Sequence, residues 1–175
     1  ADVEDAIRRG YRGPLERLEA LGALPAGSIL AHGVHLDVAQ VKRAGELGCW
    51  IVQNPRSNKN NMVGYPPALA ASERIAVGTD GFVSDMREEW LTLAEEASAH
   101  GEPHTVVACR ANGGRSLVAE LWGAPGRPSE DPDLTGACEI GPEGVKHLSL
   151  AGRELVRDCT LQTGDYDAIQ AEARE

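Results

Sequence analysis

The chain has 175 residues, 42% hydrophobic and only 4% aromatic, so we expect a single domain whose core is mostly Ala, Leu and Val. Its formal net charge of −10 repels phosphate backbones and anionic membranes, which argues against a nucleic-acid-binding protein. No apolar stretch reaches the roughly 20 residues of a membrane span, and no signal peptide is visible, so we expect a cytoplasmic protein. The four cysteines form no CxxC pair, so we expect neither a zinc knuckle nor a disulfide framework.

The first hundred residues predict helices alternating with short strands. Residues 3–21 carry a helical pattern that is interrupted near Gly10, Gly13 and Pro14. Continuous apolar runs predict three buried strands, at 28–31, 49–52 and 74–78. Between and after them we expect a helix capped by Asp37 that ends near Leu47, a long polar loop over 56–64, a short helix from Pro66 to about Ser72, and an acidic helix capped by Ser84 or Asp85 that ends near Ala99.

The pattern changes after residue 101. We expect two short helices, 104–110 and 116–122, around the Gly-Gly pair at 113–114, and a loop over 124–144. Residues 145–150 and 154–157 flank a glycine turn and predict a β-hairpin, and Asp165 is expected to cap a terminal helix over 166–175.

Strands that alternate with helices and lack polar residues are typical of a parallel sheet covered on both faces. In such α/β folds, and in barrels above all, the chemistry is placed at the carboxyl ends of the strands. Two candidate catalytic residues occupy that position, His32 directly after the first strand and Asp80 just after the third. A buried carboxylate at position 80 needs a metal, a cation or several donors. His35 is a weaker candidate, because Gly33 suggests a turn that separates it from His32.

A polar loop after the second strand supplies candidate substrate-binding residues. Asn54, Ser57 and Asn58 can hydrogen-bond a polar substrate at this edge of the sheet, although local turns within the loop explain them equally well. Arg56 could meet an anionic group, but exposed loop charges are usually solvated. Glu88 and Glu89 are most simply assigned to the solvent face of a helix.

Three motifs in this order and spacing, AHGVHL at 31–36, NPRSNKNNMVGY at 54–65 and VGTDGFVSDM at 77–86, resemble the metal-dependent amidohydrolase superfamily. They are most similar to its aminohydrolase and chlorohydrolase branch, and to the SsnA-type aminohydrolases in particular. The resemblance runs over residues 1–122 and returns at 150–158 and in the closing helix.

The resemblance implies an α/β fold, the C-terminal part of a (β/α)₈ TIM barrel. The three strands would be barrel strands six, seven and eight, in a partial barrel domain at 1–122. Residues 123–175 would form a loop, a β-hairpin and a helix, the remnant of a small β-sandwich domain. The resemblance also assigns His32 as the histidine that polarises water or substrate, or binds metal in binuclear relatives, and Asp80 as the metal ligand that exchanges protons with the attacking water.

The implied cofactor is a divalent metal, zinc foremost and iron as the alternative. Two departures bear on the substrate and the fold. Gln53 stands where the family usually has a histidine, and 124–144 lacks the family's Gly-x-x-Ala-Asp-Leu run. A catalytic zinc site keeps about three protein ligands, so we expect the N-terminal half of the barrel, from the same parent chain or from a second chain, to supply the others.

The function that follows is hydrolysis of non-peptide carbon–nitrogen bonds, as in the deamination of a heterocyclic small molecule, with this chain inactive alone. Two alternatives stay open, a truncated and inactive homologue that acts as a binding or scaffold domain, and a chlorohydrolase. We expect a small-molecule substrate, a homo-oligomer, and no nucleic-acid or membrane partner.

Overall fold

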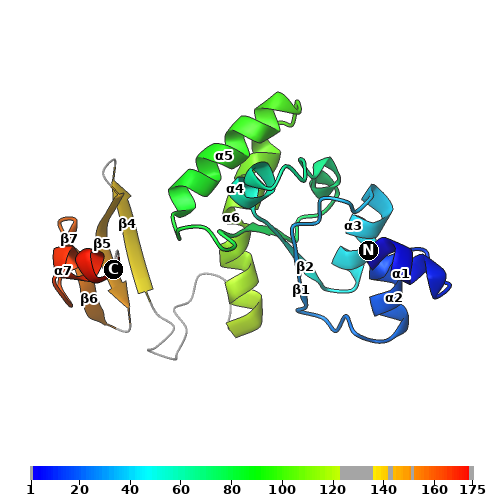
Figure 1. Cartoon of the computed structure of the whole chain (residues 1–175), viewed down its shortest axis with the longest axis horizontal. Helices are drawn as coiled ribbons and strands as arrows, with labels where there is room; N and C mark the ends of the chain where they lie inside the picture. The colour runs from blue at the N-terminus through cyan, green and yellow to red at the C-terminus, as the bar shows by residue number, and fades with distance from the viewer. Residues whose placement is uncertain (1, 123–135, 142–143, 151, 174–175) are drawn as a thin grey trace. The chain divides into compact units, whose positions relative to one another are not determined.

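The computed structural model describes residues 2–122, 136–141, 144–150 and 152–173. The chain divides into two compact units, Ala1–Leu121 and Trp122–Glu175 (Figure 1).

A parallel sheet of three strands forms the centre of the first unit. The strands lie in the order β1-β2-β3, and their bounds are Ile29–Ala31, Trp50–Gln53 and Ile75–Val77. Register pairs Ala31 with Val52, and Gln53 with Val77. All three strands therefore end at one edge of the sheet, as the sequence predicted.

Two short helices, α1 (Asp2–Arg8) and α2 (Pro14–Ala20), precede the sheet. The predicted break between them is confirmed: Gly10 has a φ of 86° and Pro14 is the first residue of α2, where its missing N–H costs nothing. The third helix, α3 (Val38–Glu46), begins with a reciprocal capping box between Asp37 and Gln40, so the predicted cap is also confirmed.

The predicted polar loop after β2 is wrong in its first part. Residues Pro55–Asn60 form the α-helix α4, which Pro55 opens at its first position, and a 3₁₀ helix, η1 (Pro67–Ala71), follows. Asn and Ser are weak helix formers, so the sequence alone favours a loop here. The helix is held by partners from other elements, which are described with the site below.

The predicted pair of short helices after residue 101 is also wrong. After α5 (Met86–Ala99), capped by Asp85, the chain forms one continuous helix, α6 (His104–Trp122), through the Gly-Gly pair. Gly113 lies against β3, and a Cβ atom at this position would be only 1.8 Å from the carbonyl oxygen of Ile75. The glycine that weakens the helix therefore allows it to approach the strand.

Polar anchors fix α6 to the sheet at two points. The carboxylate of Glu120 accepts hydrogen bonds from Arg74 and from the indole nitrogen of Trp50, the latter at 3.2 Å. Arg110, which is 2% exposed, donates to Gln53 at the end of β2 (3.2 Å). The core beneath these contacts is aliphatic, as composition predicted, and includes Leu15, Leu24, Val41, Ala44, Cys49, Ile51, Leu69 and Ile75.

The second unit contains an antiparallel sheet of four strands in sequence order. Their bounds are Gly136–Gly141 for β4, Gly144–Leu150 for β5, Arg153–Arg157 for β6 and Thr160–Leu161 for β7. The predicted hairpin is β5 and β6, and Asp165 caps the predicted terminal helix α7 (Tyr166–Glu172).

The predicted loop over 124–144 is corrected at β4, which pairs with β5 over six residue pairs. Glycine, alanine and glutamate give this segment little strand preference of its own, and the pairing with β5 stabilises the strand. The rest of that predicted loop, 124–135 and 142–143, lies outside the described residues. Among the helices of the described chain, none is long and apolar enough to cross a membrane.

Candidate functional site

The two predicted catalytic residues lie at the carboxyl edge of the parallel sheet. His32 follows β1 directly and Asp80 follows β3. Both have left-handed backbone conformations, with φ of 65° and 53°. Residues other than glycine rarely adopt this region, and those that do cluster where function requires an imposed geometry. Met62, Asp158 and Cys159 share this backbone conformation, so it accompanies the two positions but does not by itself identify a site.

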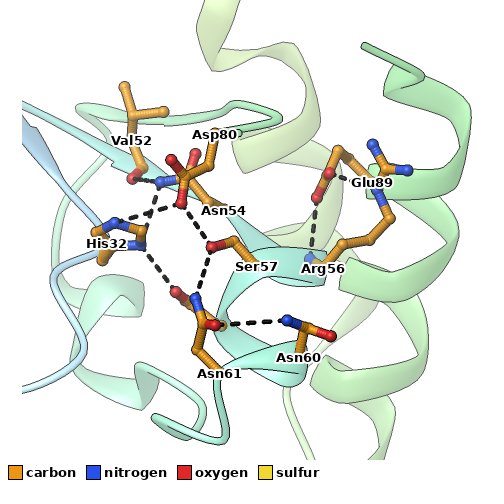
Figure 2. Close-up of polar contacts among 10 residues, drawn as sticks. His32, Val52, Asn54, Arg56, Ser57, Asn60, Asn61, Asp80 and Glu89 are labelled. Carbon is orange, nitrogen blue, oxygen red and sulfur yellow. Dashed lines mark hydrogen bonds and ion pairs between the residues drawn. The ribbon is translucent and has the colours of Figure 1, made fainter. Parts of the chain in front are cut away.

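The side chains of His32 and Asp80 face each other across the end of β2 (Figure 2). The distance from Nε2 of His32 to Oδ2 of Asp80 is 3.7 Å. The two side chains are 39% and 41% exposed, so the carboxylate is not buried as the sequence suggested. A small ligand can therefore reach both groups.

Helix α4 supplies a hydrogen-bond partner to each member of this pair. Ser57 donates from Oγ to Oδ2 of Asp80 at 2.5 Å, and Oδ1 of Asn58 lies 2.9 Å from Nδ1 of His32. Ser57 and Asn58 are 2% and 4% exposed. These contacts exist because α4 is a helix: its first turn presents consecutive residues to the ends of two different strands.

Asn54 lies beside His32, buried at the start of α4. Its Nδ2 atom is 3.3 Å from Nδ1 of His32 and donates to the carbonyl of Val52 at 3.4 Å. Gly78 provides the room, because a Cβ atom there would be 2.9 Å from Oδ1 of Asn54. The structure thus brings together all five predicted site residues: His32, Asn54, Ser57, Asn58 and Asp80.

The tautomer of His32 follows from these contacts. Nδ1 cannot donate to Asn58 and also accept from Asn54, and the shorter contact is to the amide oxygen of Asn58. That geometry favours a proton on Nδ1 and leaves the lone pair of Nε2 facing Asp80.

The hydrogen bond from Ser57 is the main cause that holds the pKa of the Asp80 carboxyl below its usual range. Partial burial opposes it, while the backbone N–H of Gly81 and the nearby His32 ring lower the pKa further. Asp80 is therefore a carboxylate at neutral pH and can act as a base or as a metal ligand.

Two other residues considered from the sequence take no part in the hydrogen bonds of this cluster. His35 is exposed. Gln53, which stands where the family usually has histidine, is 1% exposed, and its Oε1 accepts a hydrogen bond from Arg110. A cavity of about 190 Å³ is lined by Gln53, Asn58 and Tyr65 but by neither His32 nor Asp80. His32 and Asp80 converge outside this cavity.

Arg56 and Glu89, both expected from the sequence to be solvated, form a largely buried ion pair on the other side of α4 (Figure 2). Glu89 was assigned to the solvent face of its helix and is instead completely buried. Glu89 lies four residues before Leu93 and eight before Ala97, so the helical spacing of α5 places all three on one buried face, a signal that separates Glu89 from Glu88.

The donor set fits part of a metal site. Zn–N and Zn–O bonds are each about 2.0–2.2 Å long, so ligand atoms 3.7 Å apart can contact one ion. No group of three or more His, Cys, Asp or Glu side chains with the arrangement of a metal site occurs in the described part of the chain. His32 and Asp80 are thus two suitably spaced donor groups, fewer than the approximately three protein ligands that a catalytic zinc keeps.

The chain is similar in sequence to curated deaminases over about half of their length. The chain is 36% identical to a 5-methylthioadenosine/S-adenosylhomocysteine deaminase of Syntrophobacter fumaroxidans, over 99% of this chain and 47% of that protein. It is 29% identical to the protein of the same name from Natronomonas pharaonis, over 94% of this chain and 45% of the relative. The chain thus spans about half the length of the curated relatives it matches. No protein-family model matches the chain.

The fold is also that of a solved enzyme structure. An adenosine deaminase from Xanthomonas campestris with bound zinc superposes with a TM-score of 0.74 at 23% identity, and the match covers 99% of this chain and 47% of that protein. At this identity the likeness concerns the fold alone.

Proposed function

Since the chain belongs to the amidohydrolase superfamily, we propose that it carries the C-terminal part of the active site of a metal-dependent hydrolase that deaminates an adenosine-like heterocycle. The observation that carries the proposal is the pairing of His32 with Asp80, 3.7 Å apart at the carboxyl ends of β1 and β3. In this assignment β1, β2 and β3 are barrel strands six, seven and eight of a domain at 1–122. Residues 123–175 belong to the family's β-sandwich region.

In the proposed reaction, water adds to the ring carbon that bears an amino group, and the carbon–nitrogen bond then breaks to release ammonia. Asp80, ionised at neutral pH, takes a proton from the attacking water and returns it to the leaving nitrogen. The Nε2 lone pair of His32 accepts a hydrogen bond from the same water and orients it. Protons thus move between water and leaving group through a carboxylate that Ser57 holds in place.

Asp80 would bind the metal, zinc or iron, with His32 beside it or as a second ligand. A bound divalent metal supplies a nucleophile at neutral pH, because it lowers the pKa of coordinated water from about 15.7 toward about 7. The remaining ligands must come from a longer parent chain or from a second chain, so this chain alone is inactive in the proposal.

Among the predicted substrate-binding residues, we assign positioning roles to Asn54 and Ser57, whose side chains are engaged by the catalytic pair. Asn58 differs, because its Nδ2 atom is buried and has no hydrogen-bond partner while its Oδ1 contacts His32. This donor is the one we propose for a substrate or an ordered water. An unpaired buried N–H group costs about 1–3 kcal/mol, so a partner there is favoured.

The proposal is tested on the protein that includes the reading frame upstream of Ala1. We expect that protein to release ammonia from at least one member of a panel of adenosine-like nucleosides and to contain a divalent metal. Asp80→Asn should lower the rate by about 10²–10⁴-fold and reduce the bound metal. Glu95→Gln, an exposed carboxylate on α5, is the matched control. Unchanged metal content in Asp80→Asn would show that the ligand assignment is wrong.

The alternatives make different predictions. An inactive scaffold homologue would contain no metal and would tolerate Asp80→Asn without loss of function. A chlorohydrolase would release chloride and no ammonia from paired chloro- and amino-substituted substrates; it is the weaker candidate, because the relatives compared above are named deaminases. A cytoplasmic location fits the four unpaired cysteines, and a homo-oligomer remains part of the proposal.

A further inference from the structure

The ion pair between Arg56 and Glu89, like that between Arg110 and Glu102, is largely buried. Glu89 lies on α5 and is 0% exposed, and the Arg56 side chain on α4 is 18% exposed. Each carboxylate oxygen has its own donor: Nε of Arg56 at 2.5 Å from Oε1, and the backbone N–H of Arg56 at 3.1 Å from Oε2. Burial of an ionised group is costly unless it is paired and hydrogen-bonded, and here both conditions are met.

Glu89 also supplies the cap that α4 lacks. The residue before the helix, Asn54, makes no capping hydrogen bond with its side chain, and Pro55 has no N–H. The first N–H group of α4 is therefore that of Arg56, and it is bound by the Glu89 carboxylate. An anion at this end is also favoured by the helix dipole. A residue on α5 thus stabilises the start of α4.

The Arg56 guanidinium extends the contact to a third segment. Its Nη2 atom donates to the carbonyl of Val83, and its carbon lies 5.3 Å from the centre of the Phe82 ring. Both residues belong to the loop between Asp80 and α5. One side chain therefore joins the start of α4 to the loop that leads away from Asp80.

The next two residues of α4 hold the catalytic pair. Ser57 donates to Asp80 and Asn58 contacts His32, so three consecutive residues reach the loop, the aspartate and the histidine. Asp80 sits in a strained backbone region, which persists only where the surroundings fix it. We propose that Glu89 and Arg56 are positioning residues for the candidate site: they lock α4 to the loop of Asp80 and so set the geometry of the pair. This inference rests on the proposed function.

The test compares two ion pairs that join α4 to α5, the buried pair of Arg56 with Glu89 and a more exposed pair. Lys59 and Glu96 also link α4 to α5, at 3.1 Å, but Lys59 is 53% exposed. Amide hydrogen exchange is measured on the 175-residue chain for wild type, Glu89→Gln and the control Glu96→Gln. We expect Glu89→Gln to raise exchange by about tenfold in 54–58 and 79–85, with less than about a twofold change in β1 and β2. Glu96→Gln should match wild type in all of these segments.

A milder variant separates the two functions of the pair. Arg56→Lys retains the charge near Glu89 and the backbone N–H that the carboxylate caps, but a single ammonium cannot reproduce the fork that also reaches Val83. Exchange should therefore rise in 79–85 and stay near wild type in 54–58. If both variants raise exchange equally in every strand, or neither raises it in 79–85, the positioning role is overturned.

The catalytic consequence is measured separately in the longer protein. There Glu89→Gln should lower kcat by about tenfold while KM stays within about twofold, because the substrate contacts are untouched and the pair that reacts is displaced. If Glu89→Gln loses exchange protection in 79–85 but the wild-type longer protein has no hydrolase activity, the proposed function is contradicted and the positioning of Asp80 is still supported. An unchanged kcat in a variant that has lost this protection would overturn the inference.

Discussion

Replacing Gly113 by alanine should destabilise the first unit, although alanine is the better helix former. The added Cβ atom would lie 1.8 Å from the carbonyl oxygen of Ile75 and 2.8 Å from its carbonyl carbon. A carbon atom ordinarily approaches a carbonyl oxygen to about 3.3 Å, so helix and strand would have to separate by about 1.5 Å. The strand cannot yield easily, because Ile75 and Ala76 are buried in the core.

Two opposing effects set the expected magnitude. Glycine to alanine in a helix interior gains up to about 1 kcal/mol, whereas overpacking costs about 1–3 kcal/mol and more when backbone must move. The steric effect therefore prevails, and we expect a net loss of about 2 kcal/mol in the free energy of unfolding for Gly113→Ala.

Gly114 is the matched control, because a Cβ atom there meets nothing within 4 Å. Gly114→Ala should be neutral or more stable by up to about 1 kcal/mol. Urea unfolding followed by circular dichroism measures both variants against wild type. Since β3 leads to Asp80, Gly113→Ala should also impair metal binding by the longer protein. Equal stability of the two variants would refute the close approach of α6 to β3.

Two further predictions concern polar groups around α4. Asn58→Ala should allow the neutral ring of His32 to shift its proton from Nδ1 to Nε2, which the ¹⁵N chemical shifts of the ring report. The control Asn60→Ala should keep the wild-type tautomer. A wild-type tautomer in Asn58→Ala would contradict the assignment. Burial, followed by the hydrogen bond to Glu102, raises the pKa of Tyr65 to about 12. The neutral phenol is favoured by the fold, so its contribution to stability is complete below about pH 10 and is lost as the pH rises through 12. The phenolate absorbance of wild type should show a step near pH 12 that Tyr65→Phe removes, and a wild-type titration without that step would refute the contact.

The residues that sequence patterns located correctly are those whose signals are local. Asp37, Asp85 and Asp165 cap helices as expected, because a capping side chain bonds residues only two or three positions away. The strand ends at His32 and Asp80 were predictable for a similar reason, since a continuous apolar run marks a buried parallel strand and a polar residue marks its end.

The errors have a common physical cause. Residues 56–64 and the Gly-Gly pair at 113–114 have weak helix preference, and their local sequence gives no reason to expect α4 or a continuous α6. In both cases a contact far along the chain decides: Glu89 caps α4, and the absence of a side chain on Gly113 allows α6 to pack on β3.

The sequence by itself determined the three parallel strands, the capped helices that follow Asp37, Asp85 and Asp165, and the position of His32 and Asp80 after strand ends. Only the tertiary structure decided that Ser57 bonds Asp80, that Asn58 bonds His32, and that Gln53 turns to a buried arginine. The physical reason is the sequence separation of the residues that interact. Periodicity and capping act between near neighbours in the sequence, whereas packing determines the partners of a buried polar side chain and brings together residues more than twenty positions apart.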